Sequence, residues 1–119
     1  MFPRRQRLTN PKLFALMTRS GSWQKGRLMS ARFLLTRGNS GQISFVISKK
    51  VSKLATTRNR SKRRARAVWR SLLEGDYKNV AQSSHLLIVI HRSLVDVTPK
   101  EIYVEAEGLL RQLSRRLRP

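Results

Sequence analysis

The chain has 119 residues and a formal net charge of +20, because 26 lysines and arginines face only six aspartates and glutamates. This length suffices for a single domain with one modest core, so we expect residues 1–119 to form one domain. The absence of cysteine excludes a disulfide framework and a cysteine-ligated zinc finger, and it favours a reducing, cytoplasmic location. We expect no signal peptide and no membrane-spanning segment, since the longest apolar run covers only residues 86–90.

The first lysines and arginines belong to a short lead-in, residues 1–9, which we expect to be flexible. The pair Asn10-Pro11 then resembles a helix N-cap followed by proline at the first helical position. Apolar residues at positions 13, 14, 16 and 17 predict a short helix that ends near residue 20. Phe14 has two interpretations: a core residue of this helix, or an aromatic ring that stacks a nucleobase.

Alternation of side chains predicts two strands, residues 28–36 and residues 43–48. The turn signal Gly38-Asn39-Ser40-Gly41 between them favours an antiparallel arrangement. One face of such a sheet is apolar. The other carries small or polar side chains that can form the floor of a groove.

The most distinctive stretch is residues 49–70, KKVSKLATTRNRSKRRARAVWR, with ten basic residues and no acidic one. From about residue 55 to residue 73 it predicts a helix whose apolar stripe contains Ala65, Val68, Trp69 and Leu72. The remaining arc is densely cationic. Like charges one turn apart repel, so this face indicates a surface for an anionic partner better than it indicates a merely solvated helix face.

The charge of the whole chain supports an anionic partner. Residues 1–73 contain 19 basic residues and no acidic one, whereas the last 46 residues contain seven basic and six acidic ones. A nucleic acid fits, because neutralised phosphates release their condensed counterions. An acidic membrane surface is the alternative, but it requires a basic helix whose apolar face is free rather than packed. We therefore expect a single RNA-binding domain and no membrane partner.

The last third of the chain predicts a polar connection at residues 76–84, a buried strand at residues 86–90 and a long amphipathic helix. The buried strand should lie centrally, parallel to the strand at residues 43–48. Thr98-Pro99-Lys100-Glu101 forms a capping box that begins the last helix. The predicted fold is α+β: a two-layer α/β sandwich of order α-β-β-(β)-α-β-α, with helices packed on a mixed sheet of about four strands.

The sequence offers no set of residues suited to catalysis or metal binding. The histidines, His85 and His91, flank the predicted central strand without other ligands at metal-binding spacing. The six carboxylates lie late in the chain and form no pair typical of a two-metal nuclease. We therefore predict no catalytic residue and no protein-bound metal.

The order of residues in the basic stretch carries a family resemblance. Lys49-Lys50-Val51, then Ala55, then Arg58-Asn59-Arg60-x-Lys62-Arg63-x-x-Arg66 resembles the signature of the protein subunit of bacterial ribonuclease P. The pair Arg7-Leu8 followed by Phe14, and the order of the elements, also match that family. Three residues depart from its pattern: Ser61 and Arg64 stand where apolar side chains are usual, and Thr18 replaces a residue that is commonly aromatic. Arg64 either extends the basic face or marks a helix that sits less deeply.

The resemblance implies a catalytic RNA that removes the 5′ leader of precursor tRNA with Mg²⁺, held mainly by the RNA and not by the protein alone. It implies that the protein contacts the ribonuclease P RNA through the basic helix and its preceding loop, and that no protein partner is required. The RNA-binding residues would be Lys49, Lys50, Lys53, Arg58, Asn59, Arg60, Lys62, Arg63, Arg66 and Arg70. Phe14 and Phe33 would line a cleft for the leader between the N-terminal helix and the sheet.

Two other functions fit the composition and charge equally well. One is a ribosomal or RNA-assembly protein that only stabilises folded RNA, and the other is a nucleoid-type DNA-binding protein. Only the ordered motif from Arg58 to Arg66 favours the ribonuclease P subunit over both.

Overall fold

The computed structural model describes residues 11–20, 22–36 and 41–117. The predicted lead-in and turn residues 38–40 lie outside these ranges. The elements, in chain order, are α1 (Pro11–Ser20), β1 (Ser22–Lys25), β2 (Met29–Leu35), β3 (Ile43–Ile47), α2 (Ala55–Glu74), α3 (Lys78–Ser83), β4 (Ser84–Ile90) and α4 (Pro99–Leu117). The strands form one mixed sheet of order β1-β2-β4-β3, which confirms the α+β class and the four-stranded sheet.

Strand β4 is central, as its continuous apolar sequence predicts. It pairs antiparallel with β2 on one side and parallel with β3 on the other, so that Ile88 lies opposite both Ala31 and Phe45. The two strands predicted before the basic helix do run antiparallel, but the expectation that they form a neighbouring pair is wrong, because β4 lies between them. An all-apolar strand such as β4 is most stable where both of its faces are covered, which is the centre of the sheet. This central position of β4 separates β2 from β3.

Two elements were not predicted from the sequence. The four-residue strand β1 pairs with β2 from Ser22 opposite Phe33 to Lys25 opposite Ser30, and it is too short and polar to show a strand pattern. The helix α3 lies in the stretch predicted to be a polar connection. Its Val80 is fully buried in the core, and the neighbouring Ala81 packs against the core.

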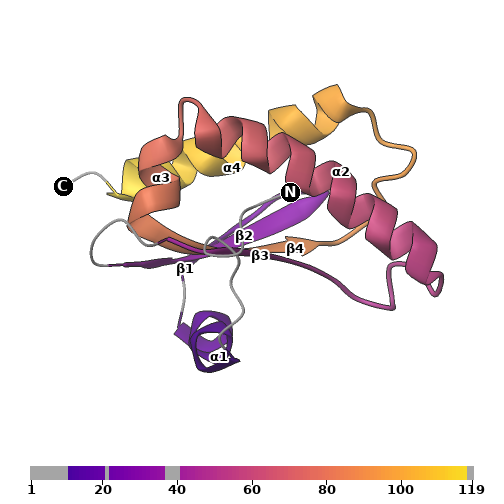
Figure 1. Ribbon diagram of the computed structural model, residues 1–119, viewed down its shortest axis with the longest axis horizontal. Coiled ribbons are helices and arrows are strands. Elements are labelled where there is room, and N and C mark those ends of the chain that lie inside the picture. Colours follow the sequence, from indigo (N-terminus) through magenta and orange to yellow (C-terminus); the bar gives the residue numbers. More distant parts are fainter. Residues whose placement is uncertain (1–10, 21, 37–40, 118–119) are drawn as a thin grey trace.

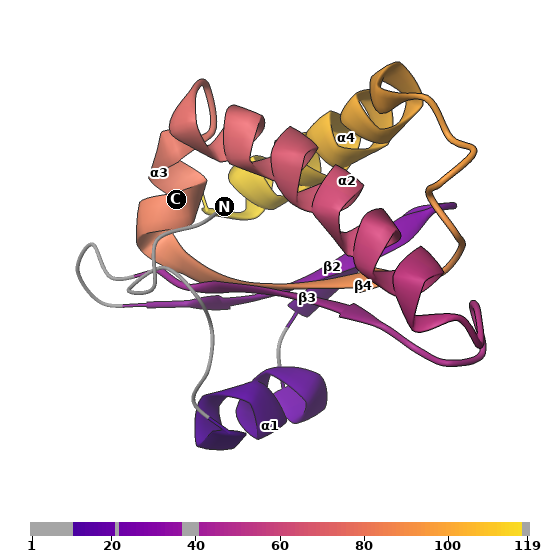
Figure 2. The same ribbon diagram turned by 45° about the vertical axis from the view of Figure 1, so that its right-hand side comes forward.

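Helices α2, α3 and α4 cover one face of the sheet, and α1 lies on the other (Figures 1 and 2). The main core lies between the sheet and α2–α4, where Trp69 is fully buried and its indole N–H points to the sulfur of Met29 at 3.5 Å. On the other face, Met17 of α1 packs on Leu87. The two-layer description therefore holds for the sheet and α2–α4, while α1 adds a partial third layer.

The bounds of the two long helices agree with the sequence signals. Helix α2 ends at Glu74, before Gly75. Before α4 the capping box forms as predicted: Thr98 N–H donates to the Glu101 carboxylate at 3.1 Å, and Glu101 N–H donates to Thr98 Oγ1 at 3.2 Å. In the described ranges, no helix has the length and apolar character needed to cross a membrane.

Candidate nucleic-acid interface

The buried stripe of α2 decides which way its basic residues point. Ser61, Ala65, Trp69 and Leu72 recur at helical spacing and are all buried against the sheet side of the helix. The opposite arc is therefore turned to solvent. Of the predicted RNA-binding residues on α2, Asn59, Arg60 and Arg63 are exposed, and Arg58, Lys62, Arg66 and Arg70 are half-buried.

The loop before α2 adds three exposed lysines, Lys49, Lys50 and Lys53, to this surface. The loop leaves β3, an edge strand, and passes directly into the first turn of α2. Arg58 holds it there, because its guanidinium donates to the carbonyl oxygens of Ser52 at 2.9 Å and Lys53 at 3.1 Å. Arg58 thus fixes the loop lysines next to the helix, in addition to contributing its own charge.

The positive charge of this surface is largely uncompensated. Among the described residues there are two ion pairs, Arg70 with Glu74 at 2.8 Å and Arg111 with Glu107 at 3.0 Å. No carboxylate in the described ranges pairs with Arg60 or Arg63. The partly neutralised Arg70 lies at the far end of the helix, so the strongest site for phosphates is the first half of α2 with its preceding loop. We refer to residues 49–66 on this surface as the basic face.

The two unusual residues of the basic stretch have structural roles. The buried Ser61 hydroxyl accepts a hydrogen bond from Leu94 N–H at 3.0 Å. Arg64 Nη2 donates to the carbonyl oxygen of Val97 at 2.9 Å. Together they hold the loop between β4 and α4 on α2. Arg64 is thus a tether to this loop, and the interpretation that it extends the basic face is not needed to explain it.

A second surface lies on the face of the sheet that α1 partly covers. Paired strands place directly opposite residues on the same face, so Trp23, Arg32, Leu87 and Ser44 form one row across the sheet. Met17 of α1 covers Leu87 in the middle of this row. At the β1 edge Trp23 stays 48% exposed, and the guanidinium carbon of Arg32 lies 5.6 Å from the centroid of its ring. This surface combines an open aromatic ring with cations, which suits a single-stranded nucleic acid.

His85 lies at the start of β4, on the same face as this row. It lies opposite Leu34, and its Nδ1 accepts a hydrogen bond from Gln42 N–H at 3.2 Å. Burial lowers the pKa of His85 below its ordinary value of 6.5. Burial thus favours the neutral form of the ring, whose Nδ1 can accept this hydrogen bond.

The prediction that Phe33 lines a cleft beside α1 is wrong. Phe33 is 6% exposed and belongs to the main core under α2 and α4. Its neighbours Arg32 and Leu34 point to the face of α1 instead, because side chains alternate along a strand. The side chain of Phe14 lies outside the described residues, although its helix is placed. The sequence did not predict the contact between Trp23 and Arg32. The two residues meet only because β1 pairs with β2, and the short polar β1 has no strand pattern in the sequence.

Comparison with known proteins finds ribonuclease P proteins among the relatives of this chain. The chain is 42% identical over 74 residues to the ribonuclease P protein component of Pseudanabaena sp. (strain PCC 6903), a match that covers 61% of this chain and 64% of the relative. Its fold is similar to that of the ribonuclease P protein of Staphylococcus aureus, with a TM-score of 0.73, 17% identity, and 91% and 94% of the two chains covered. The ribonuclease P protein of Thermotoga maritima gives a TM-score of 0.75 with 19% identity, over 91% of this chain and 97% of that one.

The family comparison covers nearly the whole chain. The family model for ribonuclease P matches residues 2–114, a span that includes the basic face and both faces of the sheet. The chain therefore belongs to the ribonuclease P protein family.

Proposed function

We propose that this chain is the protein component of a ribonuclease P ribonucleoprotein. It binds the catalytic RNA through the basic face and the 5′ leader of precursor tRNA through the sheet surface beside α1. In this way it aids Mg²⁺-dependent endonucleolytic removal of the leader. The observation that carries the proposal is the motif Arg58–Arg66 displayed on α2, where no carboxylate of residues 11–20, 22–36 and 41–117 pairs with Arg60 or Arg63. The similarity to the ribonuclease P protein component of Pseudanabaena also supports it.

The two surfaces suit two states of RNA. Folded RNA offers phosphates in a fixed shape, and cations on a rigid helix can match that shape. Single-stranded RNA offers unstacked bases, which bind aromatic rings and flat sheet surfaces. The basic face and the sheet surface beside α1 lie on opposite sides of the sheet (Figure 2), so one molecule can hold both kinds of RNA at once.

In this proposal the protein is a non-catalytic subunit of an endoribonuclease, and the RNA carries the hydrolysis of the phosphodiester. The glutamates of the described residues are already engaged: Glu105 by backbone N–H groups, Glu74 and Glu107 by arginines, and Glu101 by the capping box. No three His, Asp or Glu side chains of the described ranges gather into a possible metal site. These residues do not fit a protein-held Mg²⁺, so we propose that the metal is held mainly by the RNA.

A leader-length series tests the proposal against the alternative of a protein that only stabilises folded RNA. The protein, added to its cognate catalytic RNA at low Mg²⁺ and moderate salt, should accelerate cleavage of precursor tRNA. Shortening the leader to a single nucleotide should remove most of that acceleration. An acceleration that is the same for every leader length would instead support RNA stabilisation alone.

A further inference from the structure

The side chain of Trp23 is unusual in its position. The chain has two tryptophans, and the other, Trp69, is fully buried in the core. Trp23 is 48% exposed on β1, a strand at the edge of the sheet. A half-exposed indole contributes less to the stability of the core than a buried one. Packing therefore does not explain why so large an aromatic residue stands at this position.

Contacts with neighbouring residues fix the position of the Trp23 ring and of the strand that carries it. Arg32, directly opposite on β2, places its guanidinium over the ring at 5.6 Å. Lys25 is exposed two residues further along β1, and therefore on the same face. From α4, Arg116 donates to the carbonyl oxygen of Trp23 at 3.4 Å and to Gln24 Oε1 at 3.1 Å. The short strand β1 is thus held both by its pairing with β2 and by α4.

We propose that Trp23 stacks a base of the single-stranded 5′ leader, with Arg32 supporting the ring and Lys25 next to it for the adjoining phosphate. An aromatic ring takes any base, because every base has a π-face, so the site is expected to be tolerant of sequence. This inference rests on the proposed function and adds to it a specific contact for the leader, at Trp23 on the β1 edge of the sheet.

The order of the strands gives the site its place along the leader. The loop with Lys49, Lys50 and Lys53 begins at β3, and Trp23 lies on β1 at the opposite edge, with β4 and β2 between them. Adjacent strands lie about 4.8 Å apart, so the two edges are separated by roughly 14 Å. The proposal places the entry of the leader at the β3 edge, because the lysine loop assigned to the catalytic RNA lies there. From that edge the leader reaches Trp23 only after crossing the sheet beside α1. The contribution of Trp23 should therefore depend on leader length.

Intrinsic fluorescence tests the stacking directly, because only Trp23 is accessible to RNA. The full chain is titrated with a single-stranded oligoribonucleotide of about ten nucleotides, within the range that single-stranded binding sites cover. We expect saturable quenching of tryptophan emission in the wild type and none in Trp23→Phe, whose affinity for the labelled oligonucleotide should stay close to that of the wild type. Trp23→Ala should bind it about five- to tenfold more weakly. Binding of the oligonucleotide without any quenching in the wild type would overturn the proposal.

The reconstituted ribonucleoprotein separates this inference from the proposed function. Trp23→Ala should weaken binding of a precursor with a leader of about ten nucleotides by about five- to tenfold, and should leave a one-nucleotide leader unaffected. Trp23→Phe should restore the binding. Tyr103→Ala is the matched control, because Tyr103 is a similarly exposed aromatic residue (40%) on α4, across the sheet from α1.

The outcomes distinguish the two claims. If the wild type prefers the longer leader and Trp23→Ala keeps that preference in full, the stacking site is wrong and the proposed function stands. Equal losses in Trp23→Ala and Trp23→Phe would also contradict stacking. If the wild type shows no preference for the longer leader, both claims fall.

Discussion

The carboxylate of Glu105 holds the turn between β1 and β2 against α4. Its two oxygens accept hydrogen bonds from the backbone N–H groups of Arg27 at 2.8 Å, Leu28 at 2.9 and 2.8 Å, and Met29 at 2.8 Å. Gly26 allows this close approach, because a Cβ there would lie 2.7 Å from the Met29 carbonyl oxygen and 2.9 Å from Glu105 Cδ. One side chain of α4 therefore positions the strand that carries Trp23.

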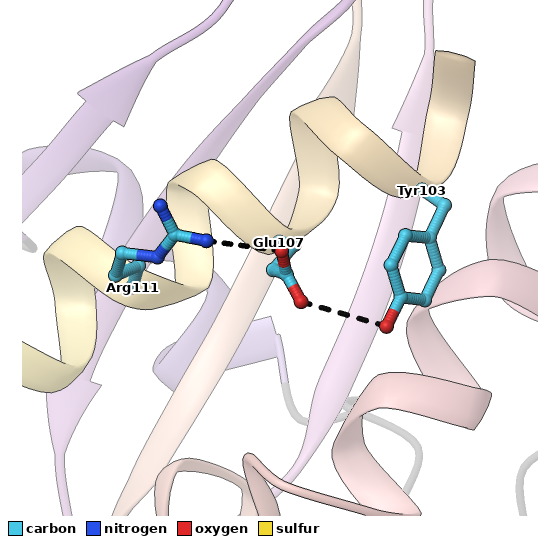
Figure 3. A network of polar contacts seen from close by, with 3 residues as sticks. All are labelled: Tyr103, Glu107 and Arg111. Atoms are coloured by element: carbon cyan, nitrogen blue, oxygen red, sulfur yellow. Dashed lines mark hydrogen bonds and ion pairs between the residues drawn. The ribbon is translucent and has the colours of Figure 1, made fainter. Parts of the chain in front are cut away.

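Glu105→Gln should lower the free energy of unfolding by about 1–3 kcal/mol, since the amide loses part of the accepting capacity and the charge that strengthens these bonds. Urea unfolding monitored by circular dichroism measures it. The control is Glu107→Gln on the outer side of the same helix, where Glu107 contacts Arg111 at 3.0 Å and Tyr103 at 3.5 Å (Figure 3). These exposed contacts should contribute less than about 1 kcal/mol. Equal losses in both variants would show that Glu105 does not hold the turn.

His85 should make the stability of the fold depend on pH. Because burial lowers the pKa of His85 in the folded state, the unfolded state binds more protons once the pH falls through the unfolded value of 6.5. Stability contributed by the neutral ring is therefore present above that pH and is lost as the pH falls towards the folded pKa.

The variant His85→Asn isolates this effect, because an amide oxygen can accept the hydrogen bond from Gln42 N–H without titrating. Between about pH 7.5 and pH 5, the wild type should lose more unfolding free energy than His85→Asn, as measured by urea unfolding at each pH. Parallel losses in the two proteins would assign the pH dependence to other groups.

At the scale of elements, α2 has an exposed basic side and a side that packs on the rest of the protein. The neighbouring residues Arg63 and Arg64 lie on different sides. Arg63 is exposed on the basic face, whereas Arg64 is tethered to the Val97 carbonyl oxygen at 2.9 Å. Arg64 Nε is buried without a hydrogen-bond partner among the described residues. Removal of Arg64 therefore relieves one unsatisfied donor while it breaks one hydrogen bond.

Arg64→Ala should lower the unfolding free energy by about 1 kcal/mol and change RNA affinity little. Arg63→Ala should leave stability within about 0.5 kcal/mol of the wild type. It should weaken binding to the catalytic RNA and flatten its log–log salt dependence by about one unit or less. Salt-dependent binding titrations and urea unfolding on both variants measure these effects. If Arg64→Ala has the larger effect on RNA binding, the two sides of α2 have been assigned the wrong way round.

The sequence predicted α2 and β4 because the residue pattern of each element indicates which of its sides is buried. The helix has a stripe and a cationic arc, and the strand is continuously apolar. It did not predict β1, whose four residues gain their order from pairing with β2, from Arg116 and from the Glu105 turn. Phe33 was assigned to the wrong face for a related reason. Alternation tells which residues share a face, but only the packing of α1 tells which face the N-terminal helix covers.

At the scale of the whole molecule, the sheet separates the basic face from the surface beside α1. Helices α2, α3 and α4 lie on one side and α1 on the other (Figure 1). The loop of the basic face lies at the β3 edge and Trp23 lies at the β1 edge, so we propose that RNA passes around the β3 edge and then crosses the sheet to Trp23. All six acidic residues come from residue 74 onward in the sequence, so residues 49–66 of the basic face contain none.

We propose that the protein supplies charge and a binding surface while the RNA supplies the reactive centre. Cleavage of precursor tRNA, measured across a Mg²⁺ series with the catalytic RNA alone, the protein alone and both together, tests it most directly. We predict no cleavage by the protein alone, and cleavage by the mixture at Mg²⁺ concentrations too low for the RNA alone. Cleavage by RNA-free protein, or an RNA whose Mg²⁺ requirement does not change when the protein is added, would contradict the claim.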